Sequence, residues 1–97
     1  MHPTLKRFLD HFPLARRVNE RSWTSDTMIG SIDFSVGRFY ISVYLAETTK
    51  GIRELSVYVH AYEDSSEINW HLTSRVDLPA EHHELLAELV HKIMEEL

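Results

Sequence analysis

Tyrosine and histidine are the residues of this sequence whose types and spacing most clearly suggest a binding surface. Six of them alternate with apolar residues in the middle of the chain: Tyr40, Tyr44, Tyr58, His60, Tyr62 and His71. Successive side chains of a β-strand point to opposite faces of a sheet, so the alternation predicts that all six share one face. Tyrosine joins a large apolar ring to a hydrogen-bonding hydroxyl and is enriched at protein interfaces. The pattern therefore predicts a surface that binds another protein, or a second copy of the chain in a homodimer.

The register of the strands decides which of these rings meet. Symmetric pairing about Lys50-Gly51 predicts three facing pairs: Tyr44 with Tyr58, Ser42 with His60, and Tyr40 with Tyr62. Pairing about Ser65-Ser66 predicts two more: His60 with His71, and Tyr62 with Asn69. A slip of two residues would change these partners but would leave every ring on the same face.

Two other interpretations of the aromatic face stay open. Cross-strand tyrosine pairs can simply stabilise a half-exposed sheet, at roughly 0.2–1 kcal/mol per pair, or the N-terminal helix can pack over them. Alternatively, His60 and His71 can contribute two nitrogen ligands to a metal or small-ligand site, although a stable zinc site needs a third or fourth. No histidine pair on the predicted last helix has the i,i+4 spacing of a metal site, so we expect surface polarity there and no bound metal.

Catalytic and nucleic-acid functions find less support. The sequence has no cysteine, glycine-rich phosphate loop, nucleophile elbow or HExxH motif, so we expect neither enzyme activity nor a cofactor. Arg16, Arg17, Arg21 and Trp23 form a basic and aromatic cluster of the kind that binds single-stranded nucleic acid. The net charge of −5 argues against that alternative, because a surface that stacks bases also needs basic residues for the phosphates.

The elements that must position these residues are two terminal helices and a sheet. Leu5, Phe8, Leu9 and Phe12 fall on one helical stripe that should end at Pro13, and a short second helix through Leu14 and Val18 is plausible before a loop at residues 19–27. Period-two alternation then predicts four strands, with a core face lined by Ile41, Val43, Val57, Val59 and Trp70. From Pro79, with Asp77 as N-cap, a helix carries a wide apolar stripe: Leu85, Leu86, Leu89, Val90, Ile93, Met94 and Leu97.

The expected architecture is therefore a single α+β domain over residues 1–97. It has an N-terminal helix, a four-stranded antiparallel β-meander and a C-terminal helix, with both helices mainly on one face of the sheet. The absence of cysteine fits a reducing compartment, and no apolar stretch suggests a signal peptide or a membrane span, so we expect a cytoplasmic protein. Charge is distributed unevenly, because the first 21 residues are basic on balance and the last 21 are acidic.

This order of elements, with Leu78-Pro79-Ala80-Glu81 opening the last helix, resembles bacterial secretion-chaperone-type domains in topology and acidity. The resemblance implies a binding module rather than an enzyme. We therefore expect a small non-catalytic protein-binding module, such as an adaptor, chaperone, immunity protein or inhibitor of a larger protein machine. Its predicted contacts are the six tyrosine and histidine residues of the sheet, with Glu84 and Glu88 on the acidic last helix as a second contact.

Overall fold

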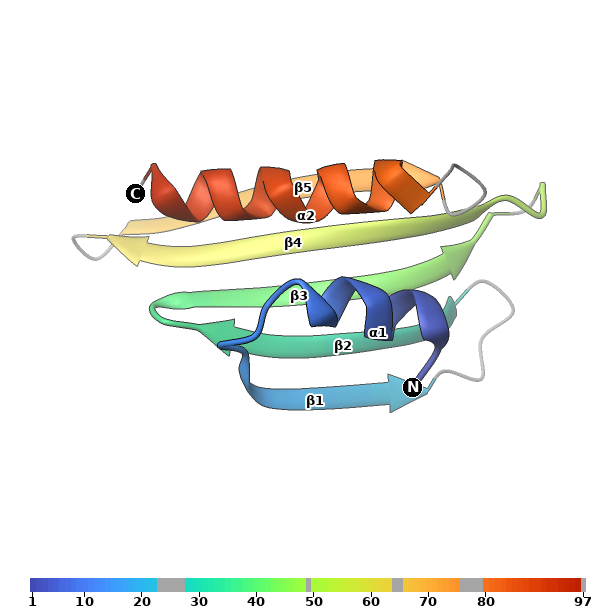
Figure 1. Cartoon of the computed structure of the whole chain (residues 1–97), viewed down its shortest axis with the longest axis horizontal. Coiled ribbons are helices and arrows are strands. Elements are labelled where there is room, and N and C mark those ends of the chain that lie inside the picture. The colour runs from blue at the N-terminus through green and yellow to red at the C-terminus, as the bar shows by residue number, and fades with distance from the viewer. Residues whose placement is uncertain (23–27, 49, 64–65, 76–79, 97) are drawn as a thin grey trace.

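Two helices and five strands make up the fold in the computed structural model, which describes residues 1–22, 28–48, 50–63, 66–75 and 80–96. Their order is α1 (Pro3–Asp10), β1 (Arg16–Ser22), β2 (Met28–Val36), β3 (Phe39–Glu47), β4 (Arg53–Glu63), β5 (Ser66–Arg75) and α2 (Ala80–Glu95). The strands form one antiparallel sheet in which each strand lies beside the next along the chain (Figure 1). This meander follows from short connections, which can join only antiparallel neighbours.

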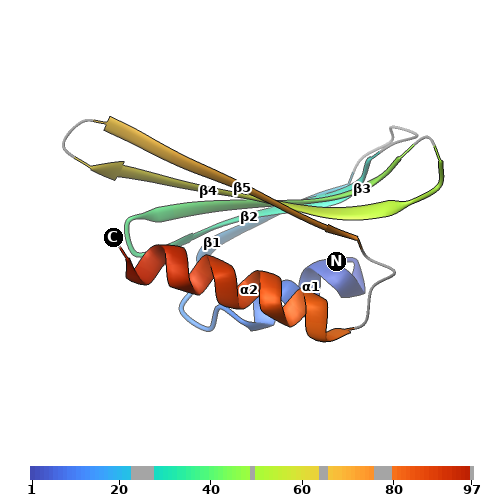
Figure 2. The same ribbon diagram turned by 90° about the horizontal axis from the view of Figure 1, so that it is seen from above.

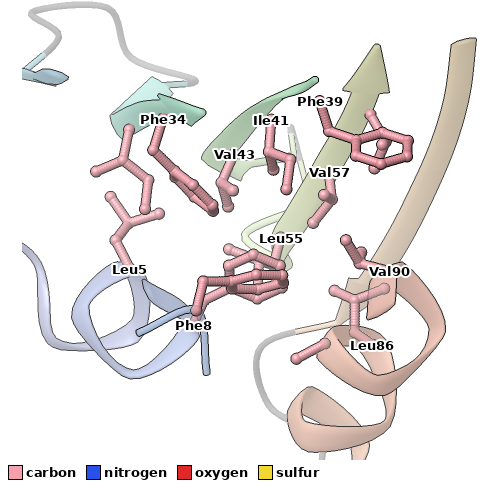
Figure 3. Packing of buried hydrophobic residues seen from close by; sticks show 14 of the residues in the cluster. Leu5, Phe8, Phe34, Phe39, Ile41, Val43, Leu55, Val57, Leu86 and Val90 are labelled. Carbon is pink, nitrogen blue, oxygen red and sulfur yellow. The ribbon is translucent and has the colours of Figure 1, made fainter. Parts of the chain in front are cut away.

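Both helices cover the same face of the twisted sheet (Figure 2). The core between helices and sheet contains the apolar side chains of β2, β3 and β4 that the alternation placed there, and Ile32, Phe34, Ile41, Val43, Val57 and Val59 are all fully buried. Leu5 and Phe8 reach this core from α1, and Leu86 and Val90 from α2 (Figure 3). The predicted α+β class and the one-sided placement of the helices are confirmed, and neither α1 nor α2 lies over the described side chains of Tyr40, Tyr44 and Tyr58.

The N-terminal helix forms where its apolar spacing places it. Pro3 occupies the first turn, where its missing N–H costs no hydrogen bond, and the His2 Nδ1 accepts a hydrogen bond from the Thr4 N–H at 3.2 Å. Leu5 and Phe8 are buried in the core, and the helix ends at Asp10, three residues before Pro13, with His11 as its C-cap.

The number of strands is the main error of the sequence-based prediction. The segment expected to form a short helix and the start of a loop is instead the strand β1, which pairs with β2 at the edge of the sheet. Val18 is 43% exposed, and β1 buries little, so the strand depends on backbone hydrogen bonds to β2 rather than on an apolar face. Hydrophobic periodicity carries no signal for such a strand.

The last helix contacts the core through fewer residues than its sequence suggested. Leu86, Ala87 and Val90 are buried, and Ile93 and Met94 pack partly against them, but Leu85 and Leu89 are 51% and 49% exposed. The predicted apolar stripe is therefore only partly covered. Asp77, Pro79 and Leu97, which the prediction included at the ends of this helix, lie outside the described residues.

Histidine 91 joins the two helices, a role that differs from the surface polarity expected for it. Its Nε2 donates a hydrogen bond to the His11 carbonyl oxygen at 2.8 Å, just beyond the end of α1. Its ring also stacks on Phe12, with 4.4 Å between ring centroids and 17° between planes. The residue thus ties α2 to the end of α1 through both a polar and an aromatic contact.

Candidate functional site

The sheet face opposite the helices, here called the outer face, carries the predicted tyrosine and histidine residues. Backbone alternation puts Tyr40 and Tyr44 of β3, Tyr58 and His60 of β4, and His71 of β5 on this face, while their apolar neighbours fill the core. Position 62 shares the face by register, although the side chain of Tyr62 lies outside the described residues. The outer face is therefore available to solvent rather than covered by α1.

The pairing between strands differs from the predicted register by two residues on both sides of β4. His60 lies opposite Tyr40 and Asn69, and Tyr58 lies opposite Ser42 and His71, so the predicted pairs were wrong although the face was right. The turn between β3 and β4 explains the first shift. The Thr48 N–H donates to the Ile52 carbonyl at 2.7 Å and the Gly51 N–H donates to the Thr48 carbonyl at 2.9 Å, which centres the turn one residue earlier.

The second shift arises at the other end of β4. The ladder between β4 and β5 runs without interruption from Glu54 and Arg75 to Glu63 and Ser66. Only two residues connect the strands beyond that last pair, so the centre of the turn also lies one residue earlier than predicted.

Three rings form a continuous ladder across the outer face. Tyr44 and Tyr58 meet edge to face, with ring centroids 5.6 Å apart and planes at 88°. Tyr58 then stacks on His71, with centroids 4.3 Å apart and planes at 4°. The Thr73 Oγ1 lies 3.1 Å from the His71 Nε2 and fixes the imidazole in turn. Each ring of this aromatic ladder therefore has a neighbour that favours its observed orientation.

A shallow open hollow of about 340 Å³ lies beside the aromatic ladder. Its lining combines apolar and hydroxyl groups: Met28, Ser42, Tyr44, Ala46, Ser56, Tyr58 and His60. Ligand pockets that enclose a small molecule usually measure about 300–1,000 Å³ and bury most of the ligand. The hollow has the size of a small pocket without enclosing walls, so it suits one or two side chains of a protein better than a whole ligand.

Two buried polar residues that were not predicted as site residues also lie on the outer face. Asp33 is 8% exposed and Ser31 is 1% exposed, both on β2. Tyr40 remains 46% exposed, but its pKa is raised above 10.0 by loss of solvation and by the negative charge of Asp33, which accepts a hydrogen bond from the Tyr40 hydroxyl. The positive charge of Arg21 partly opposes this shift. The period-two polar pattern of β2 was the signal that could have identified these residues.

His60 and His71, the two histidines considered as metal ligands, each contact another residue of the outer face. His60 and His71 are not opposite each other, and each has other contacts: His60 Nδ1 lies 3.5 Å from Glu67 Oε1, and His71 stacks on Tyr58. Within the described ranges, no group of three or more histidine, aspartate or glutamate residues could hold a metal ion. A metal would have to displace these existing contacts.

The remaining predicted contacts lie elsewhere on the molecule. Glu84 and Glu88 are exposed on α2, which packs on the opposite face of the sheet, so they cannot share one flat contact with the aromatic ladder. Arg16 and Arg17 lie on the edge strand β1, and Arg21 is near Tyr40, whereas Trp23 lies outside the described residues. The structure thus separates the predicted residues into an outer face, an acidic helix and a basic edge.

Comparison with known proteins gives no further guide to identity, since no protein-family model, curated protein or solved structure matches this chain. In the part of the chain that the structure describes, neither helix is long and apolar enough to cross a lipid bilayer.

Proposed function

We propose that this chain is a small, non-catalytic, cytoplasmic protein-binding module of the adaptor, chaperone, immunity or inhibitor kind, and that its outer face is the binding surface. The observation that carries the proposal is the aromatic ladder of Tyr44, Tyr58 and His71 beside an open hollow. Tyrosine is a frequent hot-spot residue of protein interfaces, where aromatic anchors pack against a partner in desolvated pockets.

Preorganisation supports the same conclusion. Binding normally costs about 0.5–1.5 kcal/mol for each flexible side chain that becomes ordered. The Tyr58 and His71 rings are already stacked on each other, so ordering them when a partner binds would cost little free energy. The hydroxyls of Ser42 and Ser56 line the hollow and supply polar groups that can orient a partner.

Affinity capture from native lysate, followed by mass spectrometry, tests the proposal. The bait is the whole chain, compared with a double variant Tyr44→Glu, Tyr58→Glu and with a matched control Glu84→Lys, Glu88→Lys on α2. We expect at least one protein that is enriched by the wild type and by the α2 control but lost with the tyrosine variant. Loss with the α2 control alone would move the site to the helix, and no enrichment by any bait would count against the proposal.

Binding of the captured protein should then be measured directly. Replacing a hot-spot tyrosine by alanine commonly costs about 2 kcal/mol or more, so Tyr58→Ala should weaken the Kd by about 30-fold. The circular-dichroism spectrum and melting temperature of each variant check that the fold survives the substitution.

A further inference from the structure

The edge strand β1 contains a strained residue in a conformation that glycine adopts most easily. Arg17 has a φ of 56°, in the left-handed region that other residues rarely enter. The register of β1 against β2 shifts between Arg16 and Asn19, where β1 has one residue more than β2, so this position is a β-bulge. A bulge with a left-handed first residue usually has glycine there. Because strained backbone concentrates at ligand sites, the Arg17 side chain is a candidate for binding.

The bulge allows two neighbouring arginines to share one hollow. On a regular strand, consecutive side chains point to opposite faces, so Arg16 and Arg17 would lie on different sides of the sheet. Here both line one open hollow of about 480 Å³, together with Leu14, Ser35 and Gly37. These five residues are here called the arginine hollow. Apart from its neighbours in the chain, Gly37 has no atom within 4 Å of the place that a Cβ would take, so the hollow is open at the turn between β2 and β3.

Neither arginine of the hollow has a counter-charge in the described part of the chain. No carboxylate there forms an ion pair with Arg16 or Arg17, and both residues are exposed. The Ser35 hydroxyl donates a hydrogen bond to the Arg16 carbonyl oxygen at 3.3 Å, which ties the main chain to β2 without using either guanidinium group. Two neighbouring positive charges repel each other, so an anion bound between them would relieve this repulsion and also accept hydrogen bonds.

We propose that the arginine hollow binds the phosphoryl group of a phosphorylated side chain on another protein. A phosphoryl group carries a charge of about −1.5 to −2 at neutral pH and has three acceptor oxygens. It therefore matches two guanidinium groups, each of which can bind phosphate through two parallel hydrogen bonds. A single carboxylate would neutralise only one of the two arginines. Leu14, which also lines the hollow and is 76% exposed, offers an apolar contact to a residue beside the phosphorylated one.

The lining of the hollow favours a phosphorylated protein over a nucleic acid. Single-stranded nucleic acid binds where aromatic side chains stack on the bases and basic residues follow several phosphates. None of the described residues that line the arginine hollow is aromatic, and the net charge of the chain is −5, which repels a long polyanion. The hollow therefore fits one phosphoryl group beside an apolar residue, rather than a row of phosphates.

Two residues of the arginine hollow belong to the outer face. Arg16 lies opposite Ser35, and Ser35 lies opposite Tyr40, so the three form one row across the sheet. A protein bound to the outer face could place a phosphoryl group in the hollow, but the hollow does not require such a protein. The inference thus goes beyond the proposed function and is independent of it. Its test uses synthetic peptides rather than a captured protein, so either proposal can fail without the other.

Titration of the whole chain, followed by two-dimensional NMR of its amide groups, tests the inference. The probe is a short peptide in which a phosphoserine lies between two leucines. We expect saturable shifts at Arg17 and Gly37, with a Kd of about 1 mM or lower, and competition by inorganic phosphate. Peptides with serine or glutamate in place of phosphoserine should bind at least about tenfold more weakly. Equal binding of either peptide, or no saturable shift up to about 5 mM phosphopeptide, would overturn the inference.

Substitutions assign the binding to the arginine hollow. Arg16→Ala and Arg17→Gly should each weaken phosphopeptide binding by at least about tenfold, whereas Arg7→Ala, which removes the same charge from an exposed site on α1, should change the Kd by less than about twofold. Arg17→Gly also relieves the left-handed strain, so its melting temperature should rise while its affinity falls, which separates lost binding from a failure to fold. Equal weakening by all three variants would refute the inference, as would tighter binding of a thymidine oligonucleotide that the same variants abolish.

Discussion

Replacement of His91 tests the account of how the two helices are held together. His91→Ala removes both the hydrogen bond to the His11 carbonyl and the stacking on Phe12. A hydrogen bond of this kind contributes about 0.5–1.5 kcal/mol net, and an aromatic pair contributes about 0.5–1.5 kcal/mol beyond its buried area. We therefore expect the free energy of unfolding to fall by about 2 kcal/mol.

A second substitution at the same site separates the two contributions. His91→Phe keeps an aromatic ring against Phe12 but removes the donor, so it should lose only about 1 kcal/mol, the share of the hydrogen bond. Lys92→Ala is the matched control on the exposed side of the same helix, and it should change stability by less than about 0.5 kcal/mol.

Urea and thermal unfolding followed by far-ultraviolet circular dichroism measure these differences. A loss of about 2 kcal/mol should lower the melting temperature by about 8–16 °C in a domain of this size. All variants are compared at one protein concentration, because self-association makes a melting temperature depend on concentration. The reasoning is refuted if His91→Ala unfolds within about 0.5 kcal/mol of the wild type.

Three further substitutions test the core, the outer face and the β1 edge. Phe34→Ala removes a side chain that is 0% exposed, so it should lower the free energy of unfolding in urea by about 3–5 kcal/mol. A decrease of less than about 1 kcal/mol would contradict the place of Phe34 in the core. The folded-state pKa of Tyr40 is raised above 10.0, so the contribution of this residue to stability is complete below about pH 10 and is lost as the pH rises through the raised pKa. Tyr40→Phe should therefore flatten the fall in stability at alkaline pH, and an unchanged pH profile would contradict this. Arg17→Gly should stabilise the chain by about 0.5–1 kcal/mol, because glycine adopts the left-handed backbone conformation of this position without strain. Arg16→Gly should not stabilise the chain, and equal effects of the two substitutions on the melting temperature would argue against strain at Arg17.

The sequence predicted the faces of the sheet better than its edges or its register. Alternation placed Val43 in the core and Tyr44 on the outer face because burial of apolar side chains fixes the face of a strand wherever a helix covers one side. It could not find β1, which lies at the edge and gains its stability from backbone hydrogen bonds. Sequence shows which side chains are apolar but not which of them contact the core. Leu85 and Leu89 were therefore included in the apolar stripe of the last helix, although both are half exposed.

The candidate site was predicted in composition but not in detail. The two-residue shift in register depended on the turn at Thr48 and Gly51, whose hydrogen bonds the sequence does not specify. A separate shift, between β4 and β5, brings Tyr58 onto His71 and leaves His60 opposite Asn69, so the predicted pair of facing histidines is replaced by an aromatic ladder. The geometry of the outer face therefore depends on the registers on both sides of β4.

Chemical-shift mapping tests the central claim, that the outer face binds another protein, most directly. The isotopically labelled chain would be titrated with the protein captured from lysate, and two-dimensional spectra of its aromatic and amide groups recorded. We predict that the largest shifts occur at Tyr44, Tyr58 and His71, with Leu86 and Val90 on α2 unchanged. Shifts confined to α2 or to the β1 edge, with the aromatic ladder unaffected, would contradict the claim.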